Sequence, residues 1–598
     1  MISENALGTA APDRYAFADF ILERQQQRLR RVDGREVALT PRLFSALLLF
    51  VERADELLDR DVLLAALWSG LVVEENNLNQ VVSGLRRVLG DNGHDRRFIE
   101  TVPRRGFRFV AAVTEIRIRA PSEGGTLTLA VLPFVPLMLE RRDESLELGM
   151  ADSLIARLST MPGLVVRSVG SLRRFAGPDQ DPLAAARALD VAWIVDGSLQ
   201  RDADRVRISA RLLRAADGTA QWSGQFDERF VDVFQAQDQI SARVAGVLAT
   251  HLVRLGIGAA PGLATVEIGG SRDPDAYQLY LAARQQAQGV RADGLQRSIQ
   301  LYEEALAIDE EYALALVGLA ESHRRLIFGA DSPPAEVFPP YRRAVMRAIA
   351  IAPELAEAHA QLGWIHFWHD FDWPGAERVF RHAITLNPNV VSARFGLGFL
   401  LLTLGRGDEG IAQMSVAREL DPMSLIINTM EASFLFALGR RDEARLRLGR
   451  VLQIEVSFWV AHMARAEFLW ADGDFNGAIE AMAHADSLAD RSSQATAMRG
   501  VLLAGAGRTD EARAVLARLQ EQAAGRYIPP TSLAAVHAAL GQTNSALDAL
   551  ETAFQCRDTR LAYMRDDRRW TSLRGHPRFA ALLCRMKLDG YDLGTSGP

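Results

Sequence analysis

A glycine recurs every 34 residues in the second half of this 598-residue chain, at Gly405, Gly439, Gly473, Gly507 and Gly541. Five residues after each of these glycines stands another small residue: Gly410, Ala444, Ala478, Ala512 and Ala546. A period of this length is typical of a unit of two helices, in which small residues are needed where the helices approach closely. Such units stack on their neighbours, so we expect more than half of the chain to form an α-solenoid.

The repeat resembles the tetratricopeptide repeat, and its phase continues upstream through Ala376, Phe380, Ala383 and Pro388. The resemblance implies a superhelix whose concave face binds a protein or peptide partner. We expect an array over 273–590, with a cap over 570–588 and helix pairs at about 274–308, 312–352, 356–386, 390–420, 424–454, 459–488, 492–521 and 530–556. The second pair holds about ten extra residues, including Pro333-Pro334 and Pro339-Pro340, and we interpret these as a protruding loop.

Aromatic residues gather in one repeat beside several histidines, at Trp364, Phe367, Trp368, Phe371 and Trp373. Exposed aromatic side chains on a concave face make good anchors, so we expect these five to bind a partner. His366 and His369 have the i, i+3 spacing that metal sites use. The aromatic residues explain the segment without a metal, and we predict neither a metal site nor a cofactor.

The first hundred residues have a different pattern. Apolar positions alternate with charged ones from Tyr15 to Leu39, which predicts antiparallel strands with a turn at Asp33-Gly34. Thr40-Pro41 is a helix start, and apolar stripes predict further helices at about 60–68 and 75–89. Two short strands, 98–102 and 107–110, then flank Pro103-Arg104-Arg105-Gly106, which predicts a hairpin with a cationic tip.

The third of these helices has one apolar face and one polar face. Its apolar face carries Leu78, Val82, Leu85 and Leu89. The opposite side, the start and the flank then carry Asn77, Gln80, Ser83, Gly84 and Arg87, with Asn76 and Arg86. Amide side chains can bond adenine, arginine suits guanine or phosphate, and Gly84 would allow close approach to a major groove.

Three segments in this region, LTPRLFSALLLFVER, LNQVVSGLRRVLGD and FIETVPRRGFRF, resemble the winged-helix DNA-binding domain of OmpR/PhoB-class bacterial regulators. The resemblance implies that the third helix enters the major groove and that the wing touches the backbone and the neighbouring minor groove. It assigns double-stranded DNA contacts to Asn76, Asn77, Gln80, Ser83, Gly84, Arg86, Arg87, Thr101, Arg104, Arg105 and Arg108. No receiver domain is expected ahead of it, an order that resembles CadC-like and HilA-like regulators.

The charge of this module indicates that one copy binds DNA weakly. The whole chain has a net charge of -7, and residues 13–115 hold 16 arginines against 16 acids. Phosphate neutralisation supplies most non-specific affinity for DNA. We therefore expect a homo-oligomer on DNA, or binding to tandem sites.

Strands and helices alternate between residues 126 and 255, which predicts an α/β layer that ends in a hairpin at Asp217-Gly218. The segments LAVLPF, ELGMADSLIARL and VDGSLQRDADRVRISARLL resemble the TolB-amino-terminal-like domain. Gly256, Gly258 and Gly262 follow no strand, so they do not form a phosphate-binding loop. We assign no chemistry to this region.

The sequence therefore predicts a multidomain, mainly α protein. Its expected parts are a winged helix (13–115), a linker (116–125), an α/β domain (126–255), a second linker (256–272) and the repeat array (273–590). We see no secretory signal or membrane span, which favours the cytoplasm. The favoured function is a sequence-specific transcriptional regulator whose repeats sense a partner and control assembly. The alternative is a scaffold whose winged helix contacts proteins, and we expect no enzyme.

Overall fold

A computed structural model describes residues 14–589, except 19, 25–27, 32–35, 68–74, 92–96, 104, 117–126, 138–143, 160, 162, 169–171, 173–174, 176, 178–179, 203–204, 230–232, 255–269, 272, 288–291, 490–491 and 566. The chain divides into two compact units, Met1–Gly125 and Thr126–Pro598. Most of both expected linkers lies outside the described residues. The mainly α, multidomain fold class is confirmed.

The first unit begins with an antiparallel sheet in the order β4-β3-β2-β1-β8. Its strands are β1 (Arg14–Phe17), β2 (Phe20–Glu23), β3 (Arg28–Arg31), β4 (Glu36–Val37) and β8 (Val113–Ile116). The antiparallel strands are as the alternating pattern predicts. The expected turn at Asp33-Gly34 lies outside the described residues.

Three helices and a second small sheet make up the rest of the described part of this unit. The helices are α1 (Pro41–Glu52), α2 (Arg60–Leu67) and α3 (Glu75–Leu89), and the strands β5 (Leu57–Asp59), β6 (Ile99–Val102) and β7 (Gly106–Phe109) lie in the order β5-β7-β6. Thr40 caps α1, where its hydroxyl accepts from the Leu43 amide at 3.4 Å. Buried Phe17, Phe20, Phe98 and Phe109 join the two sheets in one core.

The second unit starts with a mixed sheet in the order β11-β9-β12-β13-β14, with β10 paired to β12. Its strands are β9 (Leu127–Val131), β10 (Val135–Pro136), β11 (Leu164–Val166), β12 (Trp193–Asp202), β13 (Arg205–Arg214) and β14 (Ala220–Arg229). The predicted hairpin joins β13 to β14, and its Gly218 has a φ of +72°. The α/β layer is thus as predicted.

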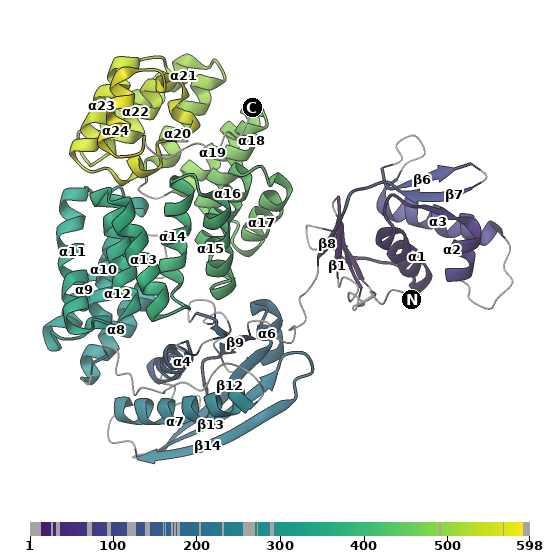
Figure 1. Ribbon diagram of the computed structural model, residues 1–598, viewed down its shortest axis with the longest axis horizontal. Coiled ribbons are helices and arrows are strands. Elements are labelled where there is room, and N and C mark those ends of the chain that lie inside the picture. The colour runs from purple at the N-terminus through teal and green to yellow at the C-terminus, as the bar shows by residue number, and fades with distance from the viewer. Residues whose placement is uncertain are drawn as a thin grey trace, which may run out of the picture. The chain divides into compact units, whose positions relative to one another are not determined.

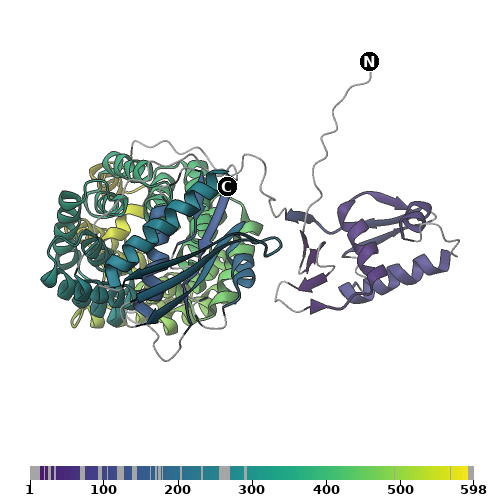
Figure 2. The same ribbon diagram turned by 90° about the horizontal axis from the view of Figure 1, so that it is seen from below.

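Helices α4 (Glu144–Leu158) and α7 (Val233–Arg254) pack against each other and against this sheet, α4 on β9 and β11 and α7 on β13 and β14 (Figure 1 and Figure 2). The shorter α6 (Pro182–Leu189) contacts β12. Because β14 pairs only with β13 among the described strands, it is an edge of the sheet.

The α/β layer is bonded directly to the repeats. Arg284 in the first repeat forms an ion pair with Asp152 of α4. Asn389 Nδ2 donates to the backbone oxygens of Ser159 at 2.6 Å and Leu164 at 3.0 Å. These bonds explain why the layer and the repeats form one compact unit.

Eight helix pairs follow in the described part of the array, as the 34-residue period predicts. They are α8 (Pro274–Gln286) with α9 (Ala292–Ile308), α10 (Ala313–Gly329) with α11 (Pro334–Ile351), α12 (Ala356–Ile365) with α13 (Trp373–Leu386), α14 (Val391–Thr403) with α15 (Gly407–Leu420), α16 (Leu425–Ala437) with α17 (Arg441–Ile454), α18 (Trp459–Ala471) with α19 (Phe475–Leu488), α20 (Gln494–Gly505) with α21 (Thr509–Ala523) and α22 (Pro530–Ala539) with α23 (Thr543–Gln555). The five periodic glycines lie between paired helices with φ of 71° to 85°. This left-handed conformation favours glycine, which explains the period.

The C-terminal part of the array packs back onto early repeats. It comprises the short turns η4 (Thr559–Tyr563) and η5 (Arg568–Leu573) and the helix α24 (Pro577–Arg585). The Tyr563 hydroxyl accepts from Trp368 Nε1 at 2.7 Å, and Trp373 Nε1 donates to the Met586 oxygen at 2.8 Å. Buried Arg560 pairs with Asp331 at 2.9 Å. The predicted cap over 570–588 contains most of η5 and all of α24, and together with η4 it joins segments about 200 residues apart.

The expectation of a protruding loop in the second repeat is wrong. Only residues 330–333 join α10 to α11, and the extra residues lengthen these helices to 17 and 18 residues. Pro339 and Pro340 lie inside α11. The neighbouring Phe338 and Tyr341 are buried, and their burial outweighs the usual cost of proline within a helix.

The expectation of an exposed aromatic patch is also wrong. Trp364, Phe367, Trp368, Phe371 and Trp373 are all buried, at 0%, 0%, 6%, 4% and 0% exposure. The C-terminal end of the array covers them: Tyr563 of η4 contacts Phe367 and Trp368, and Phe554 of α23 stacks on Phe371. These rings are part of the core and cannot anchor a partner from solvent.

The described residues contain neither a cluster of metal-ligating side chains nor a helix that could span a membrane. No group of three or more histidine, cysteine, aspartate or glutamate side chains is arranged to hold a metal. Among the helices described, none has both the length and the apolar character needed to cross a membrane.

Candidate nucleic-acid interface

The outward face of α3 carries polar side chains in the register that the sequence predicts. Asn77, Gln80, Ser83 and Arg87 are exposed. Leu78, Val82, Leu85 and Leu89 on the other side are buried at 3% exposure or less. The helix is therefore held by its apolar face and presents two amides, a hydroxyl and a guanidinium to solvent, which are groups that can bond base edges and phosphates.

The flank of α3 is tied to the hairpin β6-β7. Arg86 Nη2 donates to the Ile99 oxygen at 2.8 Å and to Thr101 Oγ1 at 2.7 Å. Buried Asp91, just after α3, accepts from the amides of Arg97 at 2.7 Å and Ile99 at 3.0 Å. These bonds fix the angle between α3 and the hairpin. Arg86 and Thr101 are therefore hydrogen-bonded to each other within the domain.

The hairpin brings its cationic tip beside β5. Val102 pairs with Gly106, and the Arg105 amide donates to the Val102 oxygen at 3.1 Å, which closes the turn. Arg105 is exposed at this tip, whereas Arg108 is half-buried in the middle strand opposite Glu100. A Cβ at Gly106 would lie 1.9 Å from the Leu58 oxygen, so only glycine fits here.

The structure assigns Gly84 a different position from the one expected. A Cβ built on Gly84 would point at Leu43 Cδ2 of α1, 3.1 Å away. The close approach that this glycine permits is therefore the packing of α3 on α1. The expectation that it brings the helix nearer to a major groove is corrected.

Two of the predicted contacts are not among the described residues, and the sequence prediction omits two residues that are exposed. Arg104 and the side chain of Asn76 lie outside the described residues. Asn79 is exposed on α3, and Arg42 is exposed at the start of α1, next to the Leu43 that packs on Gly84. The i, i+3, i+4 spacing could have indicated Asn79, whereas the position of Arg42 depends on tertiary packing.

Residues 34–109 match the family model described as "Transcriptional regulatory protein, C terminal", so this part of the chain is a domain of that family. The match covers all three helices and both strands of the hairpin. The class of protein is thus one that carries a winged-helix DNA-binding domain of the OmpR/PhoB type.

Relatives extend the likeness beyond this domain. "Transcriptional regulator HilA" of Salmonella typhimurium is 21% identical over 414 residues, 68% of this chain and 71% of the relative. "Transcriptional activator CadC" of Escherichia coli is 33% identical over 105 residues, 17% of this chain and 20% of the relative. "Putative adenylate cyclase 3" of Rhizobium meliloti is 27% identical over 193 residues, 32% of each chain.

One solved structure, the DNA-binding domain of Escherichia coli CadC, is 30% identical, covers 18% of this chain and 99% of its own, and has a TM-score of 0.16. The matched domain and the long HilA alignment identify the chain as a DNA-binding transcriptional regulator. Its winged helix is followed by an α/β domain and by tetratricopeptide-like repeats, and the HilA alignment spans 68% of this chain.

Proposed function

We propose that this regulator reads a specific DNA sequence with the exposed face of α3 and holds the duplex backbone with the tip of the β6-β7 hairpin. The observation that supports this most directly is the exposure of Gln80, Arg87 and Arg105 on elements that Arg86 ties together. If the winged helix served only as a protein contact, we would expect Arg87, Arg104 and Arg105 to be buried or paired with acids. Arg87 and Arg105 are exposed.

The two kinds of contact have different expected roles. A glutamine on the helix can bond adenine through two hydrogen bonds, which is worth about 1–3 kcal/mol of discrimination between bases. Arginines at a wing neutralise phosphates, and each contact adds roughly 0.9 to the slope of log affinity against log salt. We assign Gln80 to base reading and Arg104 and Arg105 to phosphate binding.

We further propose that the regulator acts as a homo-oligomer and that the repeat array binds a protein or peptide partner. The balanced charge of residues 13–115 supports the first point, because a neutral module gains little from phosphate contacts. The stacked helix pairs support the second, because such arrays provide extended binding surfaces. The proposal assigns a binding role to the chain and no enzymatic activity.

The test is a binding titration on genomic fragments that the full-length protein selects. Arg104→Ala with Arg105→Ala should weaken binding to all fragments alike and lower the salt slope by about 2. Gln80→Ala should change the preferred base at one position, with little change in the salt slope. Arg53→Ala is the matched control, since exposed Arg53 lies about 15 Å along α1 from the end that contacts α3.

Two results would count against the proposal. If the full-length protein binds no double-stranded fragment at low salt, it does not read DNA by this surface. If Arg53→Ala weakens binding as much as the Arg104 and Arg105 double variant, the wing has no special part in it.

A further inference from the structure

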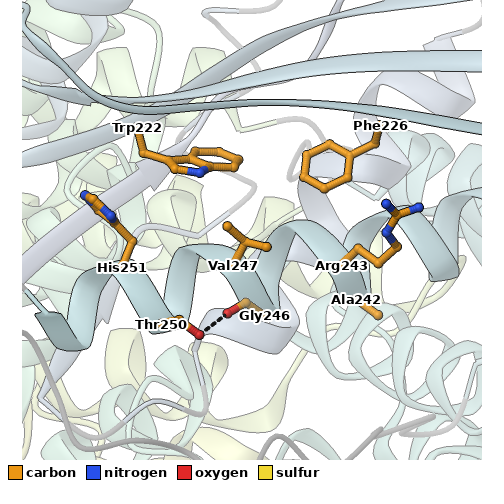
Figure 3. Close-up of a pocket in the computed structure, with 8 residues that line it drawn as sticks. All are labelled: Trp222, Phe226, Ala242, Arg243, Gly246, Val247, Thr250 and His251. Carbon is orange, nitrogen blue, oxygen red and sulfur yellow. Dashed lines mark hydrogen bonds between the residues drawn. The ribbon is translucent and has the colours of Figure 1, made fainter.

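A groove of about 560 Å³ lies between the edge strand β14 and helix α7. Figure 3 shows the rings of Trp222 and Phe226 above the helix, with Arg243 near Phe226, His251 near Trp222 and Val247 between them. The remaining lining residues are Ala242, Gly246 and Thr250. The groove is therefore apolar along its middle and polar at its two ends.

The helix side of this groove is a stripe of small residues. Ala242, Gly246 and Thr250 follow each other at intervals of four, which places them on one line along α7. The Thr250 hydroxyl donates to the Gly246 oxygen at 2.8 Å, so its hydrogen-bonding need is met within the helix. Val247 beside this stripe is 42% exposed, which is high for a large apolar side chain beside two aromatic rings.

The strand side offers an open backbone edge. β14 has ten residues, and only its β13 side is paired among the described strands. A long strand edge next to an exposed apolar surface pairs readily with another strand. Gly224 lies between the two rings, and a Cβ there would be 2.4 Å from the Trp222 ring. Its lack of a side chain lets the rings lie close together.

The sequence of β14 is complementary to itself when read in the opposite direction about Gly224. Antiparallel pairing of two copies places Trp222 opposite Phe226, and Ser223 opposite Gln225. It places Gln221 opposite Asp227, so no like charges face each other among these pairs. Cross-strand aromatic pairs and polar pairs are both favourable in antiparallel sheets.

We propose that a second copy of this chain covers the groove. In this dimer β14 of each copy pairs antiparallel about Gly224, and the stripe of small residues on α7 is buried beneath the paired strands. This inference rests on the proposed function, in which a neutral winged helix needs a second copy of the chain to bind DNA well. It names the surface through which the two copies meet.

The register can be tested by cross-linking. In the full-length protein with Cys556→Ser and Cys584→Ser, which removes both native thiols, the double change Ser223→Cys with Gln225→Cys places the two cysteines opposite each other across the interface. Both positions are exposed on β14. We expect the double variant to form a disulfide-linked dimer under mild oxidation, and each single variant to form much less.

The interface itself can be tested by sedimentation of the full-length protein without DNA. Val247→Glu places a charge on the groove floor, and we expect it to weaken the dimer by about tenfold or more, since burying an unpaired charge costs well over 1.4 kcal/mol. Val456→Glu is the matched control, because Val456 is 69% exposed in the repeat array. This control should leave the dimer unchanged.

A monomeric wild-type protein across the micromolar range would overturn the proposal and leave the groove to another occupant. A dimer that survives Val247→Glu, or equal cross-linking of single and double variants, would also overturn it. Failure of the DNA-reading proposal alone would give another result. The wild type would still form a dimer that Val247→Glu dissociates, but the wild-type protein would bind no DNA.

Discussion

Asp331→Asn tests how the closing contact between the C-terminal segment and the early repeats contributes to stability. The Asp331 carboxylate is completely buried, and it lies 2.9 Å from Arg560 Nη2 of η4. It also accepts from the amide of Ser493, just before α20. Asp331 has a φ of +47°, a conformation that asparagine also tolerates, so the substitution removes the charge and leaves the backbone unstrained.

The expected loss follows from what remains around the arginine. Removing one partner of a buried ion pair typically costs about 3–5 kcal/mol, because the other charge is left unpaired. Asp558 Oδ1 is 3.7 Å from Arg560 Nη1 and still offsets part of that charge. We therefore expect the lower end, about 3 kcal/mol.

The control is Glu310→Gln, which breaks the Arg347–Glu310 pair in the same repeats. This pair has a similar distance of 3.0 Å, but its side chains are 46% and 79% exposed. Exposed pairs contribute about 0–1 kcal/mol. The two substitutions thus make the same chemical change in opposite surroundings.

Two assays on the full-length protein measure the effect. Urea unfolding followed by tryptophan fluorescence reports on the whole fold, including Trp368, which bonds to Tyr563 of η4. Amide hydrogen exchange of η4 reports on local opening, and about 3 kcal/mol corresponds to roughly 100-fold faster exchange. If Asp331→Asn costs no more than Glu310→Gln in both assays, the buried pair does not hold the array closed.

Two further predictions concern single residues. Gly106→Ala should unfold the winged helix, because the new Cβ would meet the Leu58 oxygen at 1.9 Å. Amide protection should be lost in Met1–Gly125 and kept in Thr126–Pro598. Burial, together with Arg343, lowers the pKa of His323 to about 4. The neutral form of His323 therefore contributes fully to the free energy of unfolding above about pH 6.5. As the pH falls toward 4, this free energy should decrease by about 3 kcal/mol. Urea midpoints at pH 7 and 4.5 should therefore differ less in His323→Gln than in the wild type.

The parts of the fold that sequence predicts well are those encoded by local chemistry. The repeat boundaries follow from glycines such as Gly507, whose φ of +78° suits no other residue as well. The β13-β14 hairpin follows in the same way from Asp217-Gly218. The second repeat was predicted wrongly because proline usually ends a helix, and only the burial of Phe338 and Tyr341 shows why α11 continues.

The candidate site shows the same division between local and distant information. Spacing alone predicts which side chains of α3 face outward, since the apolar positions fix the opposite face. The position of Gly84 depends on Leu43 of another helix, and the role of Arg86 depends on Ile99 and Thr101 of a strand. The burial of Trp368 depends on Tyr563, 195 residues away. None of these contacts leaves a periodic signal.

The division into two units constrains how a signal from the repeats can reach DNA. The α/β layer is bonded to the array through Arg284, Asp152 and Asn389, so a partner that shifts the array can act on the sheet that ends in β14. The winged helix belongs to the other unit. If two copies pair through β14, their winged helices are tethered together, and such tethering can raise affinity for paired sites by about 10²–10⁴ without any new contact. A partner of the repeats should then change binding to paired sites and leave binding to a single site unchanged. Titrations with and without the partner, on fragments with one and with two sites, test this in the wild type and in Val247→Glu.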